Sequence, residues 1–584
     1  MNDEPKSIWS RPWKGRAKVL GWLAILTAAV FLFVFGYRLG FEGNGSIPKL
    51  ILYSLLFSVI ISALVAVAVL FVRWLCCWRN LRRILFGVAC AITLVALFYA
   101  EENWRGKRAW EAHKRQWEAK GEKFTLVQLA PPPVPDEQNF AMTPLLKAAM
   151  DCSGGNEGMV GRDTNGVARL ERLSAELSDG RRTNDSLVLG NLEKGTFADL
   201  AVCREFYRGN KNYPQPATPG PVAADIVFAL GKYDPEIKEL REAAATRPNS
   251  RFAIEYDHEP SWTILLPHLA KVKQICKLTQ ARAVARLELG QSREAFEELM
   301  PGLRLSDSIR DEPLLIDHLV RIATLNLNLQ VLREGLLRHA WSDVQLAELE
   351  KYLASLNLLA EYKLAMRGER ACNTSGLDWL RRQKYIHLVG ESFLDAFAEG
   401  RGPGSKYLNL MPSGWYYQNM LTISRMHQEF TLPSVDEKAH RVLPEFSGRL
   451  DEALMTMIQK RYQPYKIFAA MLFPAVNGAT RKSARMQTFV DAARVACALE
   501  RYRLTEGKLP ETLDTLVPRF IESVPTDVID GKPLRYRLKP DAGYVLYSVG
   551  WNKTDDGGEI AWIEGKKMIV DITKGDWVWQ MPGK

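Results

Sequence analysis

The sequence has none of the short motifs by which common catalytic and metal sites are recognised. Only 8 of its 584 residues are histidine, and none of them forms an HExxH or comparable metal-ligand spacing. No GxSxG motif of a serine hydrolase occurs either. The sequence therefore excludes the enzyme classes that carry these signatures, and it assigns no catalytic residue.

Cysteines are few and scattered. Of the 8 cysteines, five lie after residue 150, and no two cysteines form a CxxC pair. This excludes a recognisable zinc ribbon or thioredoxin motif. Two alternatives stay open: one disulfide in an oxidising compartment, with Cys152 and Cys203 as the candidate pair, or five unpaired, buried thiols.

Net charge is low over most of the chain. The formal charge is +10, but residues 1–108 hold 14 Lys and Arg against 5 Asp and Glu and so account for +9 of it. The rest of the chain carries a net charge of only +1. This distribution argues against a basic stripe of the kind that binds nucleic acid. We expect no nucleic-acid partner.

Long apolar runs are confined to the first 100 residues. Uncharged stretches cover residues 19–37, 50–72 and 84–100. A helix needs about 20 apolar residues, in a range of roughly 17–25, to cross a bilayer. A cleaved signal peptide would explain one such segment but not three in succession. The sequence therefore predicts a three-span transmembrane region over residues 1–100, with the lipid bilayer as a partner.

Basic residues near the predicted spans indicate their orientation. Five Lys and Arg precede the first run, and four arginines fill the second loop: Arg73, Arg79, Arg82 and Arg83. Loops that are richer in Lys and Arg stay in the cytoplasm. We therefore expect a cytoplasmic N-terminus and, after three spans, an extracytoplasmic location for all residues after 100.

The chain after the spans is expected to be mainly helical. Residues 101–135 indicate a juxtamembrane helix and a Pro-rich linker, and residues 136–484 an irregular helical body. Gly290 separates two helical stretches that are similar to one tetratricopeptide unit, although no 34-residue repeat follows. Ser342 and Gln345 form a capping-box signature at the start of a further helix.

Two segments of this body admit more than one interpretation. In the segment MRGERA, Gly368 would allow a close helix approach, and Glu369 is expected in an ion pair with Arg367, Arg370 or another basic residue rather than as a catalytic carboxylate. The apolar segment YKIFAAMLFPAV, residues 465–476, is too short to span a membrane. It fits either the protein core or the membrane surface.

The last hundred residues have a pattern of their own. Apolar residues at i, i+3, i+4 and i+7 from Ala492 mark the buried face of a helix, which Gly507 and Pro510 end. The segments LRYRL and YVLYSV then have the composition of strands. For residues 485–584 we therefore expect an α+β domain, in which a helix packs on a small antiparallel sheet.

This order of helix, Pro-bracketed turn, short strands and Asp-Asp-Gly-Gly loop resembles the C-terminal domain of major pseudopilins from type II secretion systems. Together with LAPPPVPDEQNF and MRGERA, it also resembles a family of bacterial membrane-anchored proteins without assigned activity. The resemblance implies the bacterial cytoplasmic (inner) membrane and contacts with secretion or other envelope proteins. The chain departs from pseudopilins before residue 485, where it has no prepilin-peptidase site.

The resemblance also implies a metal site. In pseudopilins the matching loop binds calcium; Asp555 and Asp556 fall on the family's acidic pair, and Ser548 lies just upstream. Calcium takes about six to eight oxygen ligands, which carboxylates and turn carbonyls supply together. Asp-Asp-Gly-Gly is also an ordinary β-turn composition, so a metal-free turn stays open as the alternative.

The sequence as a whole predicts a mainly α membrane protein. It would have three N-terminal transmembrane helices, a partly tetratricopeptide-like body and a C-terminal α+β domain. The expected function is that of a non-catalytic, membrane-anchored scaffold or interaction protein. The alternative is an envelope hydrolase or other enzyme whose site lies between helices without a linear motif, which clustered carboxylates around Glu369 would favour.

Overall fold

The computed structural model describes most of the chain. The described residues are 14–41, 47–75, 78–150, 152–155, 158–161, 163–175, 189–383, 411–459, 463–540, 543–565 and 569–582. Over these residues the protein is mostly helical, with small antiparallel sheets toward the C-terminus. The chain divides into two compact units, residues 1–101 and 102–584.

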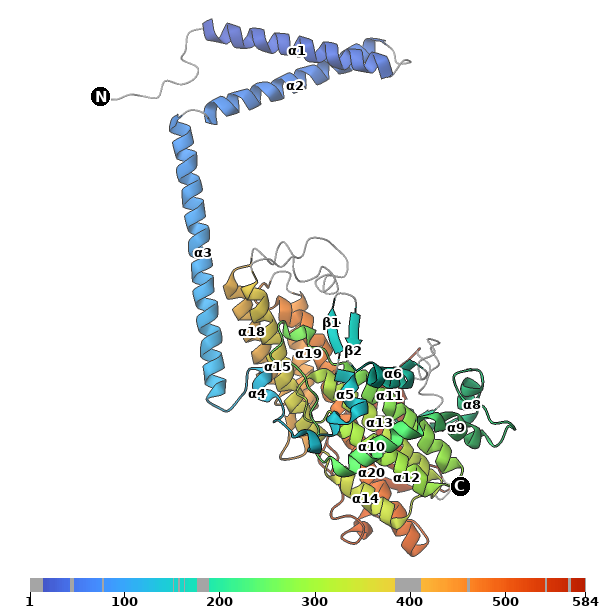
Figure 1. The fold of residues 1–584 in the computed structure, drawn as a ribbon. Helices are drawn as coiled ribbons and strands as arrows, with labels where there is room; N and C mark the ends of the chain where they lie inside the picture. Colours follow the sequence, from blue (N-terminus) through green and yellow to red (C-terminus); the bar gives the residue numbers. More distant parts are fainter. Residues whose placement is uncertain are drawn as a thin grey trace. The chain divides into compact units, whose positions relative to one another are not determined.

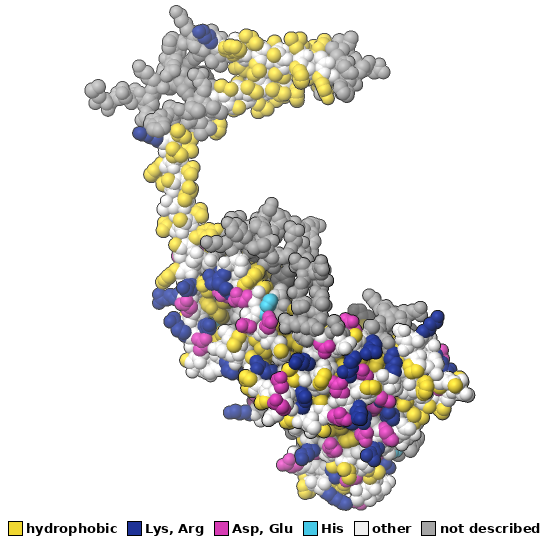
Figure 2. Space-filling model, viewed as in Figure 1, with side chains coloured by type: hydrophobic (Ala, Val, Ile, Leu, Met, Phe, Trp, Pro, Cys, Tyr) yellow, Lys and Arg dark blue, Asp and Glu magenta, His cyan; other side chains and the backbone are white. Residues whose placement is uncertain are grey.

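The first unit consists of long apolar helices. It contains α1 (Lys14–Phe41), α2 (Ile47–Leu75) and the beginning of α3 (Trp78–Glu118). Hydrophobic side chains cover these helices where they are described (Figure 2). Among the described residues, two stretches are long and apolar enough to cross a membrane, Ile51–Val69 of α2 and Asn80–Glu118 of α3.

The prediction of three spans is therefore wrong in number. The apolar part of α1 covers only Gly21–Tyr37. At 1.5 Å per residue these residues extend about 26 Å, less than the roughly 30 Å of a hydrocarbon core. α1 is a helix as expected, but among the described residues its apolar part is shorter than the two candidate spans.

α3 is one continuous helix of 41 residues, seen as a single long rod in Figure 1, and its residues from Glu102 on belong to the second unit. Trp110 is buried in the core there, and His113 Nε2 lies 2.9 Å from Ser424 Oγ of α18 (Ser413–Met426). A Cβ atom on Gly106 would collide with the backbone of Gly414, and one on Gly414 with the backbone of α3. The two helices therefore cross in direct backbone contact.

The remainder of the second unit is a body of packed helices with mixed charges on its surface (Figures 1 and 2). In chain order its other helices are α4 (Leu126–Leu129), α5 (Pro144–Met150), α6 (Thr164–Ala175), α8 (Leu200–Arg208), α9 (Val222–Leu230), α10 (Asp234–Thr246), α11 (Pro267–Glu288), α12 (Ser292–Asp307), α13 (Leu315–Leu337), α14 (Asp343–Ala354), α15 (Leu358–Arg382), α19 (Pro444–Gln459) and α20 (Ile467–Glu506). Three short hairpins, β1–β2 (Cys152–Gly155, Gly158–Gly161), β3–β4 (Leu189–Asn191, Thr196–Ala198) and β5–β6 (Val435–Asp436, Arg441–Val442), lie between helices.

Local signals in the sequence correctly place several helix ends. α11 and α12 form a hairpin at Gly290, whose φ of 70° is a left-handed conformation that glycine adopts without strain. Ser342 and Gln345 form the expected capping box at the start of α14. Cys203 is buried; the Cys152 side chain lies outside the described residues, so the candidate disulfide between the two stays a prediction.

α20 connects the helical body with the C-terminal sheet. It packs against α13, α14, α15 and α19 and then contacts the sheet; it ends at Gly507, which has a φ of 72°. The sheet has the order β11-β8-β7, formed by β7 (Arg535–Leu538), β8 (Tyr544–Ser548) and β11 (Trp577–Met581), with antiparallel neighbours. A further hairpin pairs β9 (Ile560–Trp562) with β10 (Val570–Gly575). α20 thus runs uninterrupted across residue 485.

Candidate functional site

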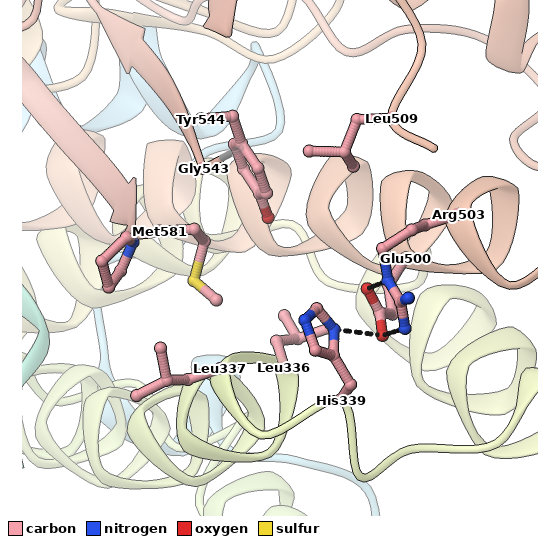
Figure 3. Close-up of a pocket in the computed structure, with 10 residues that line it drawn as sticks. Leu336, Leu337, His339, Glu500, Arg503, Leu509, Gly543, Tyr544 and Met581 are labelled. Carbon is pink, nitrogen blue, oxygen red and sulfur yellow. Dashed lines mark hydrogen bonds and ion pairs between the residues drawn. The ribbon is translucent and has the colours of Figure 1, made fainter. Parts of the chain in front are cut away.

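A pocket lies where the end of α13, the end of α20 and the C-terminal sheet meet (Figure 3). It has a volume of about 220 Å³. Most of its wall is apolar and comes from Leu336, Leu337, Leu509, Tyr544, Met581 and Pro582. Ligand pockets in proteins typically measure about 300–1,000 Å³, so this one can hold only a small molecule or part of a larger one.

One corner of the pocket is polar. His339 follows the end of α13 in a left-handed conformation, with a φ of 52°. Its Nδ1 lies 2.9 Å from Glu500 Oε1. Arg503 donates two hydrogen bonds of 2.8 Å to the same carboxylate, from Nε and Nη2. Glu500 is therefore a buried acceptor that holds an imidazole and a guanidinium together.

The charges in this corner set its chemistry. The hydrogen bonds from Arg503 to Glu500 raise the pKa of the guanidinium, so Arg503 keeps its charge. Burial raises the pKa of Tyr544 well above its ordinary value, and its hydroxyl stays protonated. Figure 3 shows the His339 ring with one nitrogen bonded to Glu500 and the other on the pocket side. The arrangement can bind one polar group of a ligand whose remainder is apolar.

The three residues of the predicted calcium site do not share one environment. Ser548 is fully buried, and its hydroxyl donates to Asp527 Oδ1 at 2.8 Å. Asp555 accepts a hydrogen bond from the Gly557 amide, and its Oδ2 lies 3.8 Å from Arg535 Nε. The Ser548 hydroxyl also accepts a hydrogen bond from the Gly550 amide at 3.1 Å, so it has partners within the turn.

A separate carboxylate, that of Asp576, holds the Asp-Asp-Gly-Gly loop in place. The buried carboxylate of Asp576 accepts hydrogen bonds from the amides of Gly558, at 2.6 Å, and Asp556, at 3.3 Å. Asp556 itself accepts from Asn552 Nδ2 at 3.0 Å. Within the described part of the chain, no group of three or more His, Cys, Asp or Glu side chains is arranged to hold a metal ion. Calcium at Asp555 and Asp556 stays a prediction.

Asp527 is a functional position in the fold that the sequence did not suggest. Its carboxylate is fully buried and accepts hydrogen bonds from the amides of Ile529 and Val549, from Ser548 Oγ and from Arg535 Nη1. Burial raises the pKa of this carboxylate, and the hydrogen bonds oppose the rise. Asp527 therefore ties the turn before β7 to the end of β8.

The MRGERA segment lies on α15 and is structural in its contacts. A Cβ atom on Gly368 would collide with the carbonyl group of Pro313, so the close approach at this glycine comes from the loop before α13 and not from another helix. Arg367 and Arg370 both donate to Glu122, not to Glu369. Glu369 accepts a hydrogen bond from Asn373 Nδ2 at 3.0 Å. The expected pairing of Glu369 with Arg367 or Arg370 is wrong, because neighbouring positions on a helix do not face each other.

A group of buried ionisable side chains surrounds the start of α13. His268 Nε2 lies 2.9 Å from Glu312 Oε2, and Phe252 stacks on the imidazole. Burial raises the pKa values of Glu312 and Asp317 well above their ordinary range, and it lowers the pKa of His268 to about 4. His268 Nδ1, Glu312 Oε1 and Asp317 Oδ1 have no hydrogen-bond partner in the described part of the chain. This group is the feature closest to the enzyme alternative.

The sequence did not predict the pocket corner or the buried group at the start of α13, because the residues of each come from separate parts of the chain and meet only in the fold. His339 and Glu500 are 161 residues apart, and His268 and Glu312 come from different elements. The one local signal is the i, i+3 spacing of Glu500 and Arg503 on a helix, which is common on any helical surface.

Comparisons with protein-family models, with curated proteins and with solved structures give no significant match. Over the described residues, the fold and the site define a class: a mostly helical protein with two helices that could cross a membrane and small C-terminal antiparallel sheets, with a small pocket between these sheets and the helical body.

Proposed function

We propose that this chain is a membrane-anchored scaffold or interaction protein whose folded body is held firmly at the end of a membrane helix. The observation that carries the proposal is α3. The same helix contains an apolar stretch that could span a bilayer and a C-terminal part that is embedded in the body's core. The apolar stretch and the body are thus joined by one helix and not by a flexible linker.

An extracytoplasmic location of the body is part of the proposal. The loop between α2 and α3 is flanked by Arg73, Arg79, Arg82 and Arg83, and such a loop stays in the cytoplasm. The chain that follows α3 then lies on the opposite side of the membrane, whether or not α1 crosses it. If α1 also crosses the membrane, the N-terminus lies on the cytoplasmic side.

Partners from a secretion system or another envelope assembly are also proposed. The support is the resemblance of residues 485–584 to the pseudopilin domain and the packing of α20 on the antiparallel sheet β11-β8-β7. Because α20 runs through the core of the body, this region would present its contacts from a fixed position on the scaffold.

The test is crosslinking of the tagged, full-length chain in intact cells, followed by identification of the proteins that co-purify from the membrane. Deleting residues 485–584 would cut α20 inside the core, so a point variant is preferable. Gly106→Leu should separate α3 from α18, and Gly87→Leu is the matched control, because nothing lies within 4 Å of a Cβ atom there. Recovery of the same envelope proteins with the native chain and Gly87→Leu, but not with Gly106→Leu, would support the proposal. Recovery of the chain alone would contradict it.

A second candidate function is binding of a small ligand, the first requirement of the enzyme alternative. It is favoured by the apolar pocket whose only polar corner is formed by His339, Glu500 and Arg503, among the residues that line it. The corresponding test is a thermal-shift screen of small apolar acids and alcohols against the native chain and His339→Phe. Ligands that stabilise only the native chain would support this function, and equal shifts for both would count against it.

A further inference from the structure

The tip of the hairpin formed by α19 and α20 carries apolar side chains on its outer face. Met455 and Ile458, near the end of α19, are 60% and 58% exposed, and Ile467 and Met471, at the start of α20, are 46% and 38% exposed. The opposite face of the same α20 turns is core, with Ala469 and Phe473 fully buried. The core interpretation of the segment 465–476 is thus confirmed for one of its faces, and contact of the other face with the membrane surface stays a prediction.

Side-chain hydrogen bonds tie this tip to the first residues of α3 that follow the apolar stretch. The hydroxyl of Tyr465 donates to Glu102 Oε1 at 3.2 Å and accepts from Arg105 Nη2 at 3.1 Å. Trp415 of α18 donates to the other oxygen of Glu102 at 3.0 Å. Tyr465 precedes the exposed Ile467 by two residues. The tip therefore stays next to the first turns of α3 beyond the apolar stretch.

Backbone contacts fix the tip in this position. Asn419 of α18 is fully buried; its side chain donates to the Pro464 carbonyl at 2.7 Å and accepts from the Phe468 amide at 3.1 Å. Thr422 donates to the Tyr465 carbonyl at 3.1 Å. α18 in turn crosses α3 at the contact of Gly414 with Gly106. The turn cannot swing away from α3 without breaking these bonds.

Tyr465 at the tip is bonded to residues of α3 that follow the end of the apolar stretch closely in the sequence. The stretch ends at residue 100, so Glu102 and Arg105 follow it by about 3 and 8 Å along the helix. Each interfacial zone of a bilayer is roughly 5–8 Å thick. Basic and aromatic side chains that favour this zone lie nearby: Trp104 is exposed, Arg108 stacks on it, and Arg105 and Lys107 follow the same turns.

We propose that Met455, Ile458, Ile467 and Met471 insert into the headgroup–acyl boundary of the bilayer that α3 crosses. The contact would be interfacial, like that of an amphipathic helix whose apolar face lies in the membrane plane and whose basic neighbours attract anionic lipid. It would give the body a second attachment beside α3 and fix its tilt. This inference rests on the proposed membrane anchoring.

The test uses the purified, full-length chain in liposomes that contain phosphatidylglycerol and a nitroxide-labelled lipid. In a Cys76→Ser, Cys77→Ser, Cys90→Ser background, an environment-sensitive fluorophore is attached through Ile458→Cys. The matched control is Val344→Cys on α14, an apolar position that is 74% exposed. We expect the nitroxide lipid to quench the label at position 458 several-fold more strongly than the label at position 344.

Flotation of the same liposomes separates the possible outcomes. Equal, weak quenching at both positions in chains that float with the lipid would overturn the inference and leave the anchoring intact. A label at position 458 that is shielded from both the nitroxide lipid and aqueous iodide would also overturn it, because a protein surface would then cover the tip. Chains that do not float would contradict the anchoring itself, and with it the inference.

A second pair of variants checks the energetics. In the double variant Ile458→Asp, Ile467→Asp, a label at Met471→Cys should be quenched no more strongly than the label at position 344. The reason is that carboxylates oppose insertion of the tip. The melting temperature should not fall in detergent, since both side chains are exposed there. Unchanged quenching at position 471 in the double variant would overturn the inference.

Discussion

The crossing of α3 and α18 offers the sharpest test of how the body is held. In this crossing, a Cβ atom on Gly106 meets the backbone of Gly414, which cannot rotate away as a side chain would. Overpacking of this kind costs about 1–3 kcal/mol, and Ala gains back about 0.5–1 kcal/mol over Gly within a helix. With the obstacle being backbone, we expect Gly106→Ala to weaken the crossing by a net of about 2 kcal/mol.

The matched control is Gly87→Ala, the same substitution in the same helix at a position with open space around it. A loss of about 2 kcal/mol corresponds to a roughly 30-fold larger population of the open state, since 1.4 kcal/mol is tenfold. Hydrogen exchange that proceeds through local opening should accelerate by the same factor. The assay is therefore mass-spectrometric hydrogen exchange of residues 102–118 in nanodiscs.

Acceleration in Gly106→Ala, with native exchange in Gly87→Ala, is the expected result. Native exchange in both variants would refute the reasoning, because it would mean that α3 does not rest on Gly414. Equal acceleration in both would also refute it, since the effect would then come from the helix and not from the crossing.

Three further predictions concern the body. Gly368→Ala should destabilise the body by about 3 kcal/mol through the contact with Pro313. Gly448→Ala on α19, with open space around it, is the control and should leave the melting temperature unchanged or higher. Equal melting temperatures for the two variants would contradict the close approach. Asp527→Ala should cost about 1–3 kcal/mol for each buried donor that loses its acceptor, namely the Ile529 and Val549 amides and the Ser548 hydroxyl. The exposed Glu522→Ala serves as the control in the same melting experiment. An unchanged melting temperature would show that the turn does not depend on Asp527. Glu312 has a raised pKa in the folded state, so the folded chain binds this proton more tightly than the unfolded chain. The resulting contribution to stability is lost as pH rises from about 4.5 toward the raised pKa. Glu312→Gln should therefore gain stability relative to the native chain as pH rises from 5 to 8, measured by urea unfolding; a constant difference would contradict the pKa shift.

Local features of the fold could be predicted from the sequence, because one or two residues determine them. Gly290 and Gly507 adopt positive φ and end their helices, and Ser342 caps α14. Gly368 is also where the sequence predicted a close approach, although the neighbour is the loop before α13 and not a helix. In each case the residue type has a conformational property that no neighbour overrides.

Contacts between residues that are far apart in the sequence could not be predicted in the same way. Arg367 and Arg370 pair with Glu122, about 245 residues away, because a helix directs them away from the adjacent Glu369. Strand β11 was missed, although it pairs with the central strand β8 along five residues. The pocket depends on the packing of α13, α20 and the sheet. Nothing in the spacing of His339 and Glu500 indicates that they meet.

The most direct measurement of the central claim is alkaline carbonate extraction of membranes from cells that produce the full-length chain. The account predicts that the chain stays in the membrane pellet, because α2 and α3 hold it through apolar contacts that high pH does not weaken. Release of the intact chain into the supernatant would contradict it, and α2 and α3 would then need protein partners instead of lipid.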